Sequence, residues 1–391
     1  MTIKFFPKPL FTFIELIGCH IKRTVQRILC RLGFKPPFLV KKTVFTNKSF
    51  VERWCFMSKK IFLDALSRKD NCAGGPGTSI VSTELMQKTG IFFPDAHLQS
   101  DKMAVLAEAG HTIYGFDVVM PLFSTWHDAA ALGSPVNWGT RSQMPYCEEH
   151  IWKTPDDIVI PRDFEKRPPC QVPLDAIGLL KKRLGSDAAV CGKVFGPWTL
   201  AYHLFGIEFF LLTALDEPDT AKRILEKLTH VTLRFAAAQA GAGADCLLLG
   251  DHVSADMCSP DMYHDFLAPI HAELSEKISI PLILHTCGRT ADRIKYIRET
   301  GIPCFHYDTQ AGTPSEVRGL AGTKLSLMGG LNNPDLLRLG TEEQITQAVQ
   351  EAFSAGIDII APECAVPLDT PCANLKSAGQ AVLKIRKSKP A

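Results

Sequence analysis

A histidine and a cysteine separated by one residue end a short apolar run in "LILHTCGRT" (residues 282–290). An imidazole nitrogen and a thiolate sulfur at this spacing can bind the same metal ion. His285 and Cys287 also fit a structural interpretation, in which the histidine bonds to backbone and the cysteine packs as a small hydrophobe. Because the chain has 12 histidines and 13 cysteines, such a pair arises easily by chance. The spacing alone therefore does not distinguish a metal site from a structural role.

Two features of the surrounding sequence favour the metal. Gly288 follows at once and permits a tight turn beside a ligand. Cys364 ends a later apolar run, and Pro362 and Pro367 stiffen its loop. One imidazole and two thiolates suit zinc, with a fourth position left for chemistry, whereas the close C-x-x-C pairs typical of structural zinc sites do not occur in the sequence.

The type of ligand indicates the type of chemistry. A free thiol has a pKa of about 8.5, and coordination to a metal removes its proton. Zinc that already carries two thiolate ligands is a poor acid for activating water, but it keeps a bound thiolate nucleophilic. The predicted ligands therefore favour alkyl transfer to sulfur over hydrolysis.

Short apolar runs alternate with helical stretches from residue 57 onward. We predict strands within residues 114–123, 188–196, 244–251, 281–288, 302–308, 324–331 and 357–364. We predict helices within residues 57–70, 220–243, 259–277, 290–301 and 341–356. Repeated strand–helix units with continuous apolar strands indicate a parallel sheet covered by helices. One unbroken series without a G-x-G-x-x-G fingerprint favours a (β/α)₈ TIM barrel over a doubly wound sheet.

In such a barrel the chemistry lies at the carboxyl ends of the strands, so the polar residues there should converge on one mouth. Asp117, Asp251 and Asp256 are candidates for accepting the proton of a thiol or positioning the ligand, although strand-end capping explains each equally well. Asn332 and Arg289 are candidates for binding the cofactor or the acceptor.

Residues 1–56 differ from the rest of the chain. Residues 1–45 carry nine lysines and arginines against one acid, Glu15, and their apolar part is too short for a membrane span. We predict a basic N-terminal extension over residues 1–56 and a single barrel domain over 57–391. The extension either contains a basic amphipathic surface helix or is not part of the native domain. The net charge of +2 gives no reason to expect a nucleic-acid partner, and the scattered cysteines indicate reduced thiols in a cytoplasmic protein.

From Met57 onward the sequence resembles the uroporphyrinogen decarboxylase superfamily, and its methylcobamide:coenzyme M methyltransferase branch in particular. The matching segments are "TELMQKTGIFFPDAHLQSDKMAVLAEAG" (83–110), "GFDVVMP" (115–121), "GPWTLA" (196–201), "SPDMYHDFLAP" (259–269), "LHTCGRT" (284–290) and "APECAVPLDTPCANLK" (361–376).

The resemblance implies a zinc-dependent barrel enzyme that transfers a methyl group from a methylated corrinoid protein to a small thiol. It places the family's zinc ligands at His285, Cys287 and Cys364. It also places at Asp308 an acid that occupies the metal when the thiol is absent, although the family usually has glutamate there. The chain has no D-x-H-x-x-G motif, so we expect the methylcobamide cofactor to be carried by a partner protein.

Several alternatives stay open at this point. The acceptor can be coenzyme M, homocysteine or tetrahydrofolate; a sulfonate-bearing thiol needs a cation, for which Arg289 and Lys193 are candidates. A decarboxylase is disfavoured because residues 71–79 lack the arginines with which that branch holds its tetrapyrrole. A corrinoid accessory protein without catalysis is the remaining alternative.

Overall fold

The computed structural model describes residues 58–69 and 72–388. The predicted extension, residues 1–56, lies outside the described residues, as do Met57 and residues 70–71. The division into an extension and a barrel domain therefore stays a prediction.

Within the described residues, eight strands form one sheet. Their bounds are β1 (Ala73–Gly74), β2 (Val118–Val119), β5 (Ala189–Phe195), β6 (Cys246–Gly250), β7 (Leu282–Thr286), β8 (Cys304–Tyr307), β9 (Ser326–Leu331) and β10 (Ile359–Pro362). Their order is β1-β10-β9-β8-β7-β6-β5-β2, and each described pairing is parallel. The two end strands meet where Asp117 N–H donates to the Gly74 carbonyl (3.0 Å) and Gly74 N–H donates to the Asp117 carboxylate (2.7 Å). The expected (β/α)₈ barrel is confirmed.

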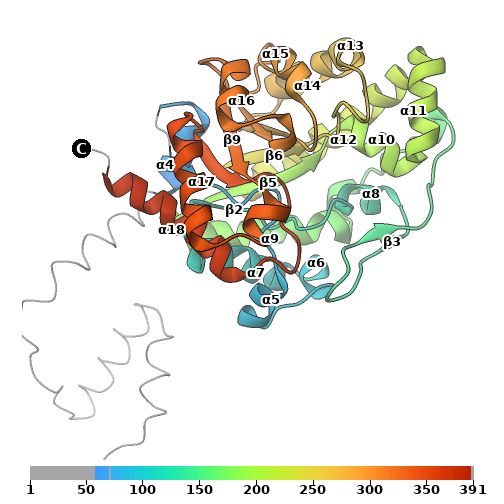
Figure 1. Cartoon of the computed structure of the whole chain (residues 1–391). Helices are drawn as coiled ribbons and strands as arrows, with labels where there is room; N and C mark the ends of the chain where they lie inside the picture. The colour runs from blue at the N-terminus through green and yellow to red at the C-terminus, as the bar shows by residue number, and fades with distance from the viewer. Residues whose placement is uncertain (1–57, 70–71, 389–391) are drawn as a thin grey trace, which may run out of the picture. The chain divides into compact units, whose positions relative to one another are not determined.

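Helices surround the strands (Figure 1). They are α4 (Ser58–Leu66), α5 (Thr83–Thr89), α6 (Asp95–Leu98), α7 (Ser100–Thr112), α8 (His127–Leu132), α9 (Pro168–Leu184), α10 (Pro197–Phe205), α11 (Ile207–Asp216), α12 (Pro218–Ala242), α13 (Pro260–Met262), α14 (Ala268–Lys277), α15 (Ile294–Ile297), α16 (Pro314–Ala321), α17 (Glu342–Ser354) and α18 (Cys372–Ser388). Short 3₁₀ helices are η1 (Pro155–Asp157), η2 (Phe164–Lys166), η4 (Ala291–Arg293) and η5 (Thr309–Ala311), and π-helical segments are η3 (Tyr263–Leu267) and η6 (Asn333–Leu337). The strand β3 (Val136–Asn137) pairs with β4 (Tyr146–Cys147) in a small hairpin.

The first described helix, α4, packs against residues of the barrel strands. Its apolar residues Ile61, Phe62, Ala65 and Leu66 are buried, and they belong to one cluster with side chains of the strands. That cluster includes Cys191, Cys246 and Cys304, which lie near the amino ends of β5, β6 and β8. Helix α4 therefore closes the amino end of the barrel with apolar surface.

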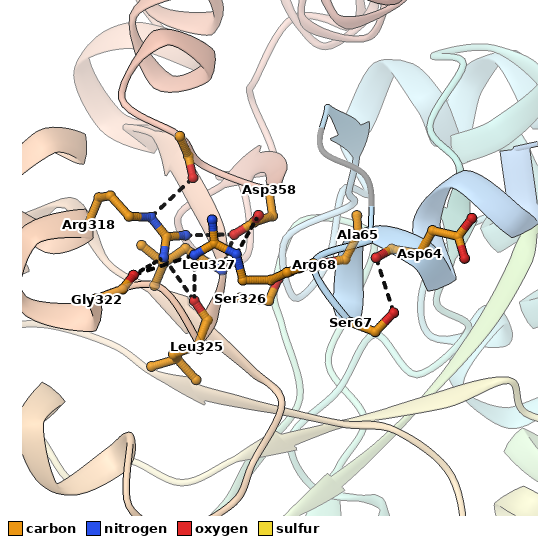
Figure 2. Close-up of polar contacts among 11 residues, drawn as sticks. Asp64, Ala65, Ser67, Arg68, Arg318, Gly322, Leu325, Ser326, Leu327 and Asp358 are labelled. Atoms are coloured by element: carbon orange, nitrogen blue, oxygen red, sulfur yellow. Dashed lines mark hydrogen bonds and ion pairs between the residues drawn. The ribbon is translucent and has the colours of Figure 1, made fainter.

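A buried carboxylate fixes the same end of the barrel (Figure 2). Asp358 directly precedes β10, its side chain is 2% exposed, and it accepts from Arg318 at 2.6 Å and from the N–H of Leu327 at 2.9 Å. Arg68, just after α4, lies 3.4 Å from the other carboxylate oxygen. The backbone carbonyl of Asp358 accepts from Ala73 N–H at 3.1 Å. One residue thus joins α4, β1, β9, β10 and α16.

No single helix in the described ranges is both long and apolar enough to cross a membrane. Helices α10 and α11 have the required length and composition only when taken together, and they are bent by 118° at Gly206.

We predict that Asp358→Asn destabilises the fold by about 3 kcal/mol, because removing one partner of a buried ion pair leaves the other charge uncompensated. The measurement is the midpoint of urea unfolding. Glu273→Gln breaks the exposed Lys277–Glu273 pair on α14 and should cost less than about 1 kcal/mol. Equal midpoints for the two variants would contradict this reading of Asp358.

Candidate metal centre

His285, Cys287 and Cys364 lie together at the carboxyl ends of their strands. His285 is in β7, Cys287 follows β7 directly, and Cys364 follows β10 by two residues. The His285 Nε2 atom is 3.0 Å from Cys287 Sγ, and the two sulfur atoms are 3.2 Å apart. Among residues 58–69 and 72–388, these are the three whose ligand atoms lie close enough together, within 4.8 Å, to hold a metal ion. The donor set of one imidazole and two thiols fits zinc.

The turn after β7 fixes the first two members of this cluster. The His285 Nδ1 atom lies 3.3 Å from the carbonyl oxygen of His306, so a proton on Nδ1 leaves the Nε2 lone pair facing the sulfur atoms. Gly288 has φ +79°, a left-handed conformation that favours glycine, and its N–H donates to Asp308 at 2.9 Å. The predicted tight turn at Gly288 is confirmed.

The loop after β1 fixes the third member. Val366 N–H donates to the carbonyl of Ser79 at 2.9 Å, which binds the Cys364 loop to the β1 loop. Gly77 has φ +61°, and a side chain there would begin 2.5 Å from the Cys364 carbonyl oxygen. Thr78 Oγ1 lies 3.6 Å from Cys364 Sγ. The close approach of these two loops requires glycine at position 77.

A cavity of about 170 Å³ opens beside the cluster. Residues that line it are Thr78, Thr125, Lys193, Phe195, Thr199, Tyr202, His203, Leu248, Gly250, Asp251, His252, His285, Cys287, Cys364 and Ala365. Most belong to strand ends or to α10, which starts at the carboxyl end of β5. The cavity has room for a small ligand with direct access to the two thiols and the imidazole.

The two thiols share one strong contact. The contact with Cys364, together with burial, raises the pKa of Cys287, whereas the contact with Cys287 and the nearby His285 lowers the pKa of Cys364. A divalent cation would stabilise both thiolates.

Lys193 places a cation inside the barrel. It lies in β5, is 3% exposed, and its Nζ atom donates to the carbonyl of Thr78 at 3.1 Å. Burial lowers the pKa of Lys193 to about 8, and the nearby Cys364 opposes that shift. The ammonium and the metal ligands thus line the same cavity.

Of the three predicted acids, the structure brings Asp251 to the cavity. Its carboxylate accepts from Thr199 N–H at 2.8 Å, from Thr199 Oγ1 at 2.9 Å, and lies 3.1 Å from His271 Nε2. These contacts fix the position of the first turn of α10. Tyr202 and His203, further along the same helix, line the cavity.

Asp256 and Arg289 form an ion pair with each other, on the loops after β6 and β7. Their side chains are 54% and 63% exposed, and neither lines the cavity. They lie on loops at the carboxyl end of the barrel, where the sequence places them, but on its solvent-exposed side.

Asp117 requires a correction of position. The sequence places it among the polar strand ends, but it directly precedes β2 and so lies at the amino end of that strand. Its carboxylate accepts from Arg386 of α18 at 2.9 Å and from Gly74 N–H. The reason is that β2 is only two residues long, and the polar residue belongs to its start.

Asp308 and Asn332 lie near the cluster but outside it. The oxygens of Asp308 accept from the N–H groups of Gly288 and Gln310, each at 2.9 Å. Asn332 caps η6, where its side-chain oxygen accepts from Asp335 N–H at 2.9 Å. Both side chains satisfy backbone groups at strand ends in this structure.

Glu363 is the polar residue of this region whose role the sequence did not reveal. It is 5% exposed and accepts from Asn333 N–H at 2.8 Å and from Thr309. The feature of the sequence that could have indicated a role for Glu363 is its position directly before Cys364, at the end of an apolar run.

Comparisons with known proteins show the family and the fold. The family model described as uroporphyrinogen decarboxylase (URO-D) matches residues 75–385. A methylated-thiol–coenzyme M methyltransferase from Methanosarcina mazei is 31% identical over 297 residues, 76% of this chain and 80% of the relative. A methylcobamide:CoM methyltransferase from Methanosarcina barkeri is 28% identical over 307 residues, 77% of this chain and 91% of the relative. A solved methyltransferase from Methanosarcina mazei has a TM-score of 0.81 at 26% identity, covering 85% of this chain and 99% of that one.

We predict that the purified chain binds one zinc ion tightly, and that His285→Ala and Cys364→Ala each abolish that binding, because two of three ligands do not hold the ion. The measurement is metal content per chain after dialysis against a weak chelator. Cys147→Ala changes a cysteine of the β3–β4 hairpin and should leave the zinc content unchanged. Full zinc content in both ligand variants would refute the assignment.

Proposed function

The chain belongs to the uroporphyrinogen decarboxylase family, and on that premise we propose that it is a zinc-dependent methyltransferase. It moves a methyl group from a methylated corrinoid protein to a thiol acceptor, coenzyme M. The observation that carries this proposal is the cluster of His285, Cys287 and Cys364, which opens onto a cavity that also contains a buried lysine. Relatives named as coenzyme M methyltransferases, from Methanosarcina, support the same reaction.

His285, Cys287 and Cys364 would hold the zinc ion. When bound, zinc would act as a Lewis acid that lowers the pKa of the acceptor thiol, so that the thiol loses its proton to water and its sulfur is nucleophilic at neutral pH. The chain's own contribution is to fix the ligands before the acceptor arrives, through the turn at Gly288 and the close packing of the β1 loop at Gly77.

The cavity orients the acceptor. Coenzyme M carries a thiol at one end and a sulfonate at the other. The thiol end is directed to the cluster, and the sulfonate end is directed to Lys193, whose ammonium lines the same cavity. Asp251 acts indirectly, because it holds the first turn of α10 and hence the wall formed by Tyr202 and His203.

The rim of the cavity is assigned to the methyl donor. We assign the exposed Arg289–Asp256 pair to contacts with the corrinoid protein, because Arg289 lies two residues after the ligand Cys287. Asp308 remains the acid proposed to occupy the metal when the thiol is absent. Asn332 is assigned to the support of the metal ligands, since its side-chain oxygen accepts from a backbone N–H group.

The size of the cavity favours this proposal over decarboxylation, the activity that gives the family its name. A volume of about 170 Å³ suits a small thiol, and a tetrapyrrole with its carboxylate arms is far larger. Homocysteine and tetrahydrofolate remain the competing acceptors, and a chain without catalysis is the competing non-enzymatic role.

The direct test is demethylation of free methylcobalamin, followed by the change in its absorbance. We expect the zinc-loaded chain to demethylate methylcobalamin with coenzyme M faster than with homocysteine or tetrahydrofolate. Preference for one of the other two acceptors would change the substrate assignment. A zinc-loaded chain that is inactive with all three would refute the methyltransferase.

We predict that Lys193→Met raises the KM for coenzyme M about tenfold or more, because a hydrogen bond to a charged group contributes about 1.5–3 kcal/mol. The KM for 2-mercaptoethanol, which has the thiol but no sulfonate, should change little. Steady-state rates with methylcobalamin at both thiols measure this difference. An equal rise in KM for the two thiols would show that Lys193 does not recognise the anionic end.

A further inference from the structure

Two buried carboxylates lie next to the proposed metal ligands in sequence and in space. Glu363 directly precedes Cys364, and Asp308 holds the residue that directly follows Cys287. They are 5% and 7% exposed. Glu363 does not belong to the group of ligand atoms within 4.8 Å of one another, and its carboxylate is occupied by N–H and hydroxyl donors.

Glu363 connects the ends of three strands. Its carboxylate accepts from the N–H of Thr309 at 3.1 Å and from the Thr309 hydroxyl, just after β8. It also accepts from the N–H of Asn333 at 2.8 Å and from the side-chain amide of Asn332 at 3.2 Å, just after β9. Its own backbone N–H donates to the carbonyl of Leu331 at 2.9 Å.

Asp308 continues the same network to β7. It accepts from Gly288 N–H and from Gln310 N–H, each at 2.9 Å. A continuous series of contacts therefore runs from Cys287 through Gly288 to Asp308 and Thr309, and from there through Glu363 to Cys364.

These carboxylates act where the strand ladder ends. The last register pair between β8 and β9 is His306 with Met328, whereas β9 extends to Leu331. Past that pair, the N–H groups of Thr309 and Asn333 find their acceptor in Glu363 instead of a neighbouring strand. A carboxylate that accepts several N–H bonds holds its partners more firmly than a neutral acceptor does.

We propose that Glu363 is a positioning residue that keeps the Cys287 and Cys364 sulfur atoms at metal-binding distance before the metal arrives. This inference rests on the proposed zinc binding. It predicts that metal affinity depends on a side chain that does not touch the metal, as outer-layer partners of metal ligands do in other proteins.

The test substitutes Glu363→Gln in the full chain. The amide keeps the size of the side chain but replaces an accepting oxygen with an NH₂ group, which would face N–H donors. We expect zinc affinity, measured by competition with a chromophoric chelator, to fall about 10- to 100-fold. In the Co²⁺-loaded chain, the thiolate-to-cobalt absorption should shift or weaken, because the sulfur positions change. Thr309→Val removes the hydroxyl, which donates to Glu363 and accepts from Asn332, but keeps the Thr309 N–H bond to Glu363, and it should give a smaller loss.

Asp358→Asn provides the matched control. Asp358 and Glu363 are buried carboxylates at opposite ends of the same strand, β10, and Asp358 belongs to the network in Figure 2. We expect Asp358→Asn to lower the unfolding midpoint and to leave zinc affinity and the Co²⁺ spectrum as in the wild type. Positioning would be overturned if Glu363→Gln bound zinc with wild-type affinity, or if Asp358→Asn weakened zinc binding equally.

The metal measurements need no thiol and no methyl donor. A wild-type chain that binds zinc but transfers no methyl group would therefore refute the proposed function and leave the positioning role intact. A wild-type chain that transfers methyl groups, with a Glu363→Gln variant of unchanged zinc affinity and spectrum, would refute the positioning role alone.

Discussion

The contact between the sulfur atoms of Cys287 and Cys364 depends on the register of four neighbouring parallel strands. The two cysteines are 77 residues apart in the chain, and β8 and β9 lie between their strands. A slip of one residue in any of these ladders would move a ligand by more than 3 Å and turn alternate side chains to the other face. The site therefore exists only in the correctly paired barrel, and no local segment can form it.

Different interactions hold the strand register at the two ends of the barrel. At the amino end, apolar side chains of α4 and the ion pairs of Asp358 join elements that are far apart in sequence. At the carboxyl end, acceptors such as Glu363 join backbone N–H groups of adjacent strand ends. Stability and chemistry commonly occupy opposite faces of this fold, and here each face has its own carboxylate on β10.

The sequence predicted the parts of the structure that periodicity and residue type determine. Continuous apolar runs predicted the strands from β5 to β10, and the ends of these runs identified His285, Cys287 and Cys364. The sequence could not show which groups these polar side chains contact. A polar residue at a strand end can bind a ligand, satisfy a backbone group or form an ion pair, and only the folded chain distinguishes Asp308 from Asp256. Asp117 was misplaced because a strand of two residues leaves almost no periodic signal.

Lys193 shows how an energetic cost can indicate the orientation of a ligand. Burying an ammonium is costly unless it gains compensating acceptors. Among the described residues, no carboxylate forms an ion pair with Lys193, and its hydrogen bond goes to the neutral carbonyl of Thr78. An ammonium has three N–H donors, so an anionic group in the cavity would supply the acceptors and the negative charge that the chain itself does not provide to Lys193. Because the thiols and the imidazole line the same cavity as the ammonium, a ligand with sulfur at one end and negative charge at the other matches both requirements at once.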